Sequence, residues 1–277
     1  MKHARIIGFF LLFLAIGISG AGAQSAKSGT EISSLKGMSL NGATGLYSIP
    51  SGRIGWERTS DLGLDFGYHT VIYDGKATHI PKISMSLFKW VELSTAFDIQ
   101  PDGYITNEKG SDFIAGAKIQ FPFTKIGLAL GGNFQALNMS NDKDLRYKAG
   151  QIYIAATYAG HFFNAPAETT VVVGKTFVED SSNWDIDFGM GFDLIFLPKV
   201  FQNYVHWITD FSNFSYSVEA FGAQAWDRGV LNTGIRIDLS VIPPLNKFKF
   251  VIDILMTDAF DDNRAFSVGV VFGIPIL

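Results

Sequence analysis

The amino-acid sequence predicts an all-β fold, a transmembrane antiparallel up-and-down β-barrel of about twelve strands. Three observations support this prediction. Apolar residues alternate with small or charged residues along most of the chain, the N-terminus carries an export signal, and aromatic residues are frequent while charged residues are sparse. Period-two alternation indicates strands with one apolar and one polar face, and a closed barrel is the sheet that can turn its apolar face to lipid.

The first 23 residues have the composition of a secretory signal peptide. A basic start (Lys2, His3, Arg5) is followed by an apolar run from Ile6 to Ile18 and by the small residues Ala21-Gly22-Ala23. The apolar run is short for a transmembrane helix, so we expect export and cleavage after Ala23. The Ser-, Gly- and Lys-rich stretch that follows predicts a flexible segment over 24–40, and a single barrel domain then occupies 41–277.

The composition excludes several classes of protein. Aromatic residues make up 14% of the chain and charged residues only 17%, yet no apolar run after the signal reaches 18 residues, which argues against a helical membrane protein. The absence of cysteine excludes disulfides and a lipidated N-terminal cysteine. Of the 22 basic and 26 acidic side chains, cleavage would remove Lys2 and Arg5, and the resulting net charge of −6 makes nucleic acid an unsuitable partner.

The clearest strand pattern runs from Trp184 to Leu194, with six apolar side chains on one face and Asp185, Asp187, Asp193 and two glycines on the other. Similar alternation predicts twelve strands, at 61–70, 79–88, 90–99, 111–121, 125–137, 150–161, 168–177, 184–196, 214–223, 229–241, 247–257 and 265–274. Short connections alternate with longer polar ones such as Tyr73–Thr78, as expected for periplasmic turns and extracellular loops.

Two segments leave the strand number open. Leu197–Asn213 becomes one long periplasmic connection, and its aromatic residues (Phe201, Tyr204, Trp207 and Phe211) favour an interfacial helix. Alternatively it contains an additional strand. An even number of strands then requires one more, which Ala43–Glu57 could supply, and the total becomes fourteen.

Aromatic residues near the predicted strand ends indicate girdles at the two membrane interfaces. They are Trp56, Tyr68, Trp90, Tyr104, Trp184, Trp207 and Trp226.

The last predicted strand resembles the C-terminal assembly signal of outer-membrane barrels. Ser267, Gly269, Phe272 and Ile274 follow the pattern of a polar residue, a glycine and two alternate hydrophobic residues. The chain departs from that signal by continuing through Pro275 to Leu277 after the motif. The resemblance implies the barrel assembly machinery as a partner, with outer-membrane lipid and lipopolysaccharide around the inserted barrel.

The segment Gly42-Ala-Thr-Gly45-Leu46-Tyr-Ser-Ile-Pro50-Ser51-Gly52 resembles the opening of bacterial outer-membrane proteins of the YjbH type. That resemblance implies an accessory role in exopolysaccharide export. From the residues themselves, we expect a strand or a lumen-facing segment whose glycines permit close backbone approach, with a turn at Pro50-Ser51-Gly52.

Acidic residues dominate the predicted inward faces. The acidic positions are Asp65, Glu92, Asp98, Asp185, Asp187, Asp193, Glu219, Asp238 and Asp253, and the basic ones are Lys118, Lys175, Arg236 and Lys249. One hypothesis is a cation-leaning pore or polar cavity, with Asp185, Asp187 and Asp193 as a ladder that contacts solute. The alternative is that these charges pair internally and plug a narrow barrel.

Catalytic and metal sites are not predicted. A membrane hydrolase needs a serine beside a histidine, and His69, His79, His161 and His206 have no serine two residues away. The acidic stretches 141–144 and 258–263 lack EF-hand spacing, so we expect solvated loops and neither metal nor cofactor.

The sequence therefore predicts an outer-membrane channel for small polar solutes. The alternatives are an accessory envelope barrel in exopolysaccharide export, an outer-membrane hydrolase with residues from distant strands, and a soluble two-sheet sandwich.

Overall fold

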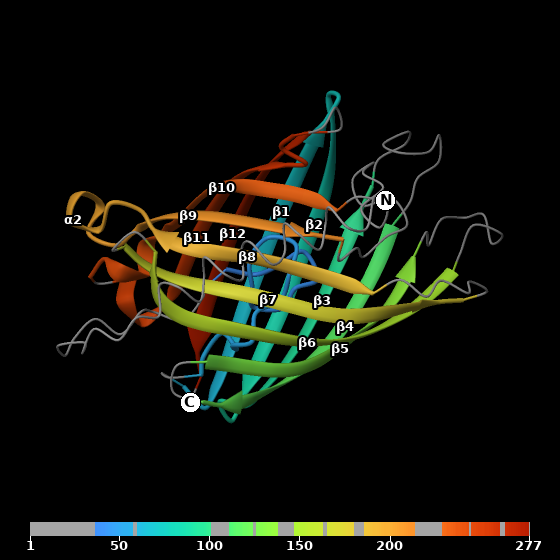
Figure 1. Cartoon of the computed structure of the whole chain (residues 1–277), viewed down its shortest axis with the longest axis horizontal. Helices are drawn as coiled ribbons and strands as arrows, with labels where there is room; N and C mark the ends of the chain where they lie inside the picture. Colours follow the sequence, from blue (N-terminus) through green and yellow to red (C-terminus); the bar gives the residue numbers. More distant parts are fainter. Residues whose placement is uncertain are drawn as a thin grey trace, which may run out of the picture.

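A computed structural model describes residues 37–57, 60–100, 111–123, 126–137, 147–162, 165–179, 186–213, 229–243, 245–260 and 264–276. They form a closed antiparallel barrel of twelve strands in sequence order (Figure 1). The strands are β1 (Leu62–Tyr73), β2 (Lys76–Leu87), β3 (Val91–Ile99), β4 (Ser111–Pro122), β5 (Ile126–Leu137), β6 (Tyr147–Phe162), β7 (Ala165–Val178), β8 (Asp187–Ile195), β9 (Val205–Ser212), β10 (Val230–Asp238), β11 (Lys249–Thr257) and β12 (Ala265–Pro275). The predicted barrel of twelve strands is confirmed.

The barrel closes through a long ladder between its first and last strands. β1 pairs with β12 from Gly63↔Pro275 to Ile72↔Phe266, and β1 also pairs with β2 along its whole length. Every strand thus has a neighbour on both sides, which satisfies the backbone without an open edge.

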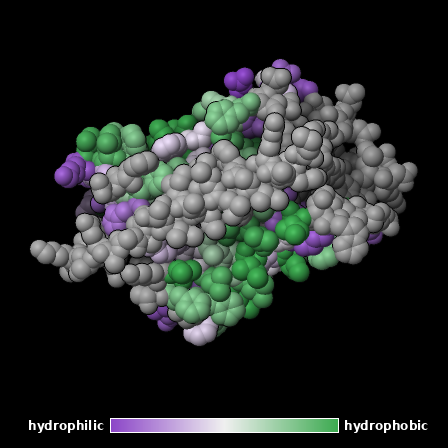
Figure 2. All heavy atoms as spheres, viewed as in Figure 1, coloured by the Kyte–Doolittle hydropathy of each residue, from purple (hydrophilic) through white to green (hydrophobic). Residues whose placement is uncertain are grey.

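The predicted alternation sorts side chains between lipid and lumen. In β1 the side chains of Asp65 and His69 are fully buried, whereas Phe66 is 43% and Tyr68 39% exposed. Outward apolar residues recur around the wall: Ile83, Leu93, Ile119, Leu130, Ile154, Val173, Trp207, Ile235, Ile254 and Val270. Apolar side chains gather on the visible wall where no grey residues cover it (Figure 2). An apolar exterior around a charged interior is the arrangement of a transmembrane barrel.

The connection between β1 and β2 is shorter than predicted. The strands are joined by Asp74 and Gly75, which have φ of 46° and 74°, and not by a loop over Tyr73–Thr78. Two residues with positive φ form the tight turn whose twist suits a hairpin, so pairing continues to Tyr73↔Lys76.

The prediction for the ninth strand is wrong. The strand lies at Val205–Ser212, inside the stretch assigned to an interfacial helix, while the predicted strand 214–223 falls outside the described residues. The only helical turn there is α2 (Pro198–Phe201). Aromatic residues three to four positions apart suggested a helix, but His206, Ile208 and Asp210 are buried inward in strict alternation with outward Trp207.

The fourteen-strand alternative is also wrong, because Ala43–Glu57 does not join the wall. This segment lies inside the barrel, where the blue trace runs within the ring of strands (Figure 1). Trp56, predicted to sit in an aromatic girdle, is 7% exposed within the lumen. Trp90 and Trp207 are 55% and 42% exposed, as a girdle requires, whereas Tyr104, Trp184 and Trp226 lie outside the described residues.

Short 3₁₀ turns at Leu239–Val241 (η3) and Leu245–Lys247 (η4) connect β10 to β11. Across the part of the chain that the structure describes, no helix has the length and apolarity needed to cross a membrane.

The outward face can be tested with a charge at mid-wall. Ile154 lies near the middle of β6 and is 55% exposed, so Ile154→Arg should cost about 2–4 kcal/mol of unfolding free energy in phospholipid vesicles. Phe260 is 89% exposed beyond the end of β11, and Phe260→Arg should cost about 0–1 kcal/mol. Equal losses in urea unfolding would contradict a lipid-facing wall at β6.

Candidate functional site

The candidate site is the lumen, which is occupied by residues 37–57 of the chain itself. We call this stretch the lumen segment. Residues 37 to 56 are all buried, although they form no regular strand. Their isolated β-bridges, Met38↔Thr44 and Gly45↔Pro50, are internal to the segment. The segment is therefore held in place by side chains of the wall and not by pairing with a strand.

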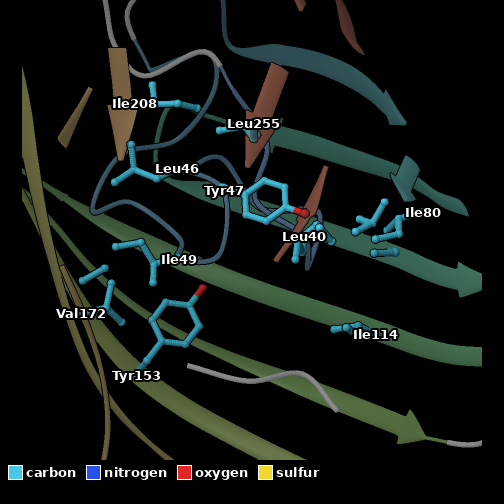
Figure 3. Packing of buried hydrophobic residues seen from close by; sticks show 14 residues of the cluster. Leu40, Leu46, Tyr47, Ile49, Ile80, Ile114, Tyr153, Val172, Ile208 and Leu255 are labelled. Carbon is cyan, nitrogen blue, oxygen red and sulfur yellow. The ribbon is translucent and has the colours of Figure 1, made fainter. Parts of the chain in front are cut away.

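An apolar cluster spans the lumen around the tip of this segment. Leu40, Leu46, Tyr47 and Ile49 lie among inward side chains from several strands of the wall (Figure 3). The wall residues of the cluster are Val71, Ile80, Ala96, Ile114, Tyr153, Ala155, Val172, Ile208, Leu255 and Ala265. Packed apolar side chains exclude water, so the contacts between the segment and these wall residues are dry.

Glycines on the inward faces make room for the segment. A Cβ at Gly189 would lie 2.5 Å from Ile49 Cγ2, and one at Gly191 would lie 2.6 Å from Leu46 Cδ1. The segment needs a glycine too, because a Cβ at Gly52 would lie 2.1 Å from the carbonyl oxygen of Gly127 in β5. Gly189 and Gly191 of β8 thus leave space for the side chains of Ile49 and Leu46.

Glu92 in β3 and Lys118 in β4 form a buried ion pair, with Lys118 Nζ 3.1 Å from Glu92 Oε1. Glu92 also accepts hydrogen bonds from the backbone N–H of Thr44 at 2.7 Å, from that of Gly55 at 3.1 Å and from the Thr44 hydroxyl at 2.6 Å. Lys118 donates to the carbonyls of Thr44, Ser51 and Arg53. Both charges are used to hold the segment.

Asp210 in β9 holds the tip of the segment from the opposite wall. Its Oδ2 accepts from the successive backbone N–H groups of Tyr47 and Ser48, each at 2.8 Å. The Ser48 hydroxyl donates to Oδ1 at 2.7 Å, and Asn232 Nδ2 donates to the same oxygen. Four donors on one carboxylate compensate for its burial without a cation.

A third network is centred on Arg236 in β10. Its guanidinium makes a two-pronged contact with Asp253, at 2.8 and 3.0 Å, and reaches Asp193 at 3.3 Å. It also donates to the carbonyl of Gly45 in the lumen segment. His69 Nε2 lies 3.5 Å from Asp253.

Asp65 in β1 holds the end of the segment. It accepts from Lys249 Nζ at 2.7 Å and from the Trp56 indole N–H at 2.9 Å, while Lys249 lies over the Trp56 ring. Trp56 therefore has a polar role inside the barrel that its position near a predicted strand end did not reveal.

The other predicted lumen residues are placed as follows. Asp98 accepts from Thr78 and Gln100, Asp187 from Gln151 and Thr176, and the side chain of Asp238 from the backbone N–H of Ser240. Asp185 and Glu219 lie outside the described residues. Lys175 shares the outward parity of Val173 and Phe177, which are 48% and 56% exposed, so its prediction as lumen-facing is wrong. Asp187 and Asp193 engage different wall partners, an arrangement that does not form a ladder.

Four buried charged residues on the described strands of the wall were not predicted: Lys82, Asp112, Glu168 and Asp210. Lys82 Nζ donates to the carbonyls of Met38 and Ser39. Lys82 could have been predicted from the sequence, because it alternates in register with Ser84 and Ser86, which also face inward. Asp210 was hidden because the ninth strand was misplaced.

The histidines do not form a serine–histidine pair in the described contacts. His206 contacts the Asp193 carboxylate through Nδ1 and the Asn203 carbonyl through Nε2, so both ring nitrogens are occupied. His79 lies outside the barrel against Tyr68. Within the described ranges no cluster of His, Asp and Glu is arranged to hold a metal.

Fold and site together define a transmembrane β-barrel whose lumen is occupied by the lumen segment of the same chain. No family model matches the chain, so the resemblance to the YjbH type gains no support, and no curated protein matches it. Among solved structures, the chain is similar to the KdgM porin at 8% identity and a TM-score of 0.45, over 77% of this chain and 99% of that one.

Two further structures show comparable similarity. Omp33 of Acinetobacter baumannii has 10% identity and a TM-score of 0.42, over 78% of this chain and 98% of that one. The translocator domain of the autotransporter NalP from Neisseria meningitidis has 9% identity and a TM-score of 0.39, over 79% and 90%. This similarity is one of barrel fold alone.

Two lysines test which charges hold the lumen segment. Lys118→Met would leave Glu92 buried without its cation and should lower the free energy of unfolding by about 3–5 kcal/mol. Lys175→Met, the same change on the outward face near the end of β7, should change the free energy of unfolding by only about 0–1 kcal/mol. The measurement is urea unfolding in vesicles, and comparable effects of the two substitutions would argue against the described lumen.

Proposed function

We propose that this chain is an outer-membrane channel for small polar solutes that the lumen segment holds closed at rest. The observation that carries the proposal is that a tethered segment fills the lumen while the wall closes without it. The ladders run strand to strand around the whole barrel, and the segment's own bridges are internal. Withdrawal of the segment would therefore leave the barrel's backbone pairing intact.

The width of the barrel supports a channel. Eight strands leave an interior that side chains can fill, whereas barrels of sixteen strands enclose an aqueous channel. Twelve strands with inward glycines and serines leave space that the wall alone does not fill, and the lumen segment occupies it. Without the segment, the lumen would be lined by Glu92, Lys118, Asp210 and Arg236, which suit polar solutes.

The proposal includes the cellular setting. Export by the cleavable signal, insertion by the barrel assembly machinery and contact with lipopolysaccharide would place the apolar wall in the outer membrane. The protein would act without a cofactor and without catalysis.

An accessory role in the envelope or in exopolysaccharide export is the second candidate. The apolar cluster around the segment favours this role, because a barrel whose lumen stays closed would act through its outer surface and would conduct no solute. The resemblance of Gly42–Gly52 to the YjbH type points the same way.

A disulfide lock separates the two candidates. Ser48 and Ser212 have hydroxyl oxygens 2.9 Å apart across the segment–wall contact, and the chain has no native cysteine. In planar bilayers we expect intermittent openings of the parent protein. Ser48→Cys/Ser212→Cys should remain silent when oxidised and should recover openings when reduced, because the disulfide keeps the segment in the lumen.

The matched control places a disulfide within the wall. Asn133 and Gln151 are directly paired on β5 and β6, so Asn133→Cys/Gln151→Cys should leave the openings unchanged in both redox states. Openings that persist in the oxidised segment–wall variant would overturn gating by the segment. A parent protein that is silent at every voltage would favour the accessory role.

A further inference from the structure

The wall contacts the lumen segment mainly through the segment's peptide groups. Four wall side chains, Glu92, Gln120, Thr157 and Asp210, accept hydrogen bonds from the backbone N–H of Thr44, Tyr47, Ser48, Gly52, Ile54 and Gly55. Three others, Lys82, Lys118 and Arg236, donate to the carbonyls of Met38, Ser39, Thr44, Gly45, Ser51 and Arg53. These seven side chains come from six strands, β2, β3, β4, β6, β9 and β10.

The division between donors and acceptors matches peptide chemistry. An ammonium or guanidinium only donates and an ionised carboxylate only accepts, whereas a sugar hydroxyl does both. A peptide carbonyl only accepts and a peptide N–H only donates, so each meets its complement on this wall. Charged partners also make the stronger hydrogen bonds.

The apolar side chains of the lumen segment are also buried against the wall. Leu46, Tyr47 and Ile49 are 0–2% exposed in the cluster with Val172 and Ile208 of the wall (Figure 3). The lumen thus receives apolar side chains at the tip of a bent chain and peptide groups on both sides of it.

We propose that the lumen is a binding site for short peptides with apolar side chains, and that the lumen segment is its built-in ligand. The inference rests on the proposed channel function and names its solute class. A solute peptide would replace the segment by making the same hydrogen bonds with Asp210, Glu92, Lys118 and Lys82.

The test converts the segment into a separate peptide. Residues 58–59 are replaced by a protease recognition site in the full chain, and the folded protein is cut there. The two pieces are unfolded together in urea and refolded in detergent with an excess of a fluorescent synthetic peptide of residues 37–57. Recombination with the chain's own fragment shows that the cut barrel refolds. We expect the labelled peptide to be incorporated and to be displaced by the unlabelled one.

Two modified peptides separate recognition of the main chain from recognition of side chains. Ester linkages that replace the N–H of Tyr47 and Ser48 by oxygen remove both backbone donors to Asp210, and should weaken binding by about tenfold or more. An ester at Ile49, whose N–H donates no hydrogen bond among the described contacts, is the matched control and should bind within about threefold of the parent peptide.

Wall variants give the reciprocal result. Lys82→Met should weaken peptide binding about tenfold, because two carbonyls lose their donor. Asp98→Asn changes a lumen carboxylate whose described partners are Thr78 and Gln100 of the wall region, and should leave binding unchanged.

The proposal is overturned if the Tyr47/Ser48 diester binds as tightly as the parent peptide, if no labelled peptide is incorporated, or if maltohexaose displaces it as well as the unlabelled peptide does. Failure of the channel function has a different signature. In that case the cut barrel would bind the peptide but would conduct no current after the peptide is washed out.

Discussion

The structure depends on the need to satisfy the peptide groups of an irregular segment inside a barrel. A buried N–H or carbonyl without a partner costs free energy, and the lumen segment has no strand beside it to supply partners. The wall meets this need with charged side chains. Glu92, Lys118, Asp210 and Arg236 are therefore arranged around the segment's backbone, and their burial is tolerable because each has several hydrogen-bond partners.

This constraint accounts for the pairing of charges inside the barrel. Charges on inward faces suggested either a cation-leaning pore or an internally paired plug, and the described contacts support pairing. Asp65 with Lys249, Glu92 with Lys118, and Arg236 with Asp193 and Asp253 leave little unbalanced charge in the middle of the barrel. The apolar cluster lies among these networks, so packed apolar side chains and satisfied polar groups together hold the segment. The same groups would line the lumen if the segment left.

The barrel was predictable from the sequence because strand alternation is local. Leu62 to Tyr73 shows its inward and outward faces within twelve residues, and the register follows from pairing with the next strand. The prediction of the ninth strand was wrong because Phe201, Tyr204, Trp207 and Phe211 have helical spacing by coincidence. Within the strand itself, outward Trp207 and Phe211 alternate with inward His206, Ile208 and Asp210. The site was less predictable. Ser48 meets Asp210 across 162 positions and Gly45 meets Arg236 across 191, and no local pattern records such contacts. The glycines of Gly42–Gly52 indicated close backbone approach, but the surface they approach was visible only in the fold.

The central claim is that the lumen segment is seated in the barrel of the intact protein. Fourteen backbone N–H groups between Ser39 and Gly55 donate hydrogen bonds there. Amide hydrogen exchange of the full chain in lipid, read by mass spectrometry over residues 37–57, tests this directly. The structure predicts protection of this stretch on the timescale of minutes or longer, approaching that of the strands. Complete exchange within seconds, while β1 and β12 stay protected, would contradict the account.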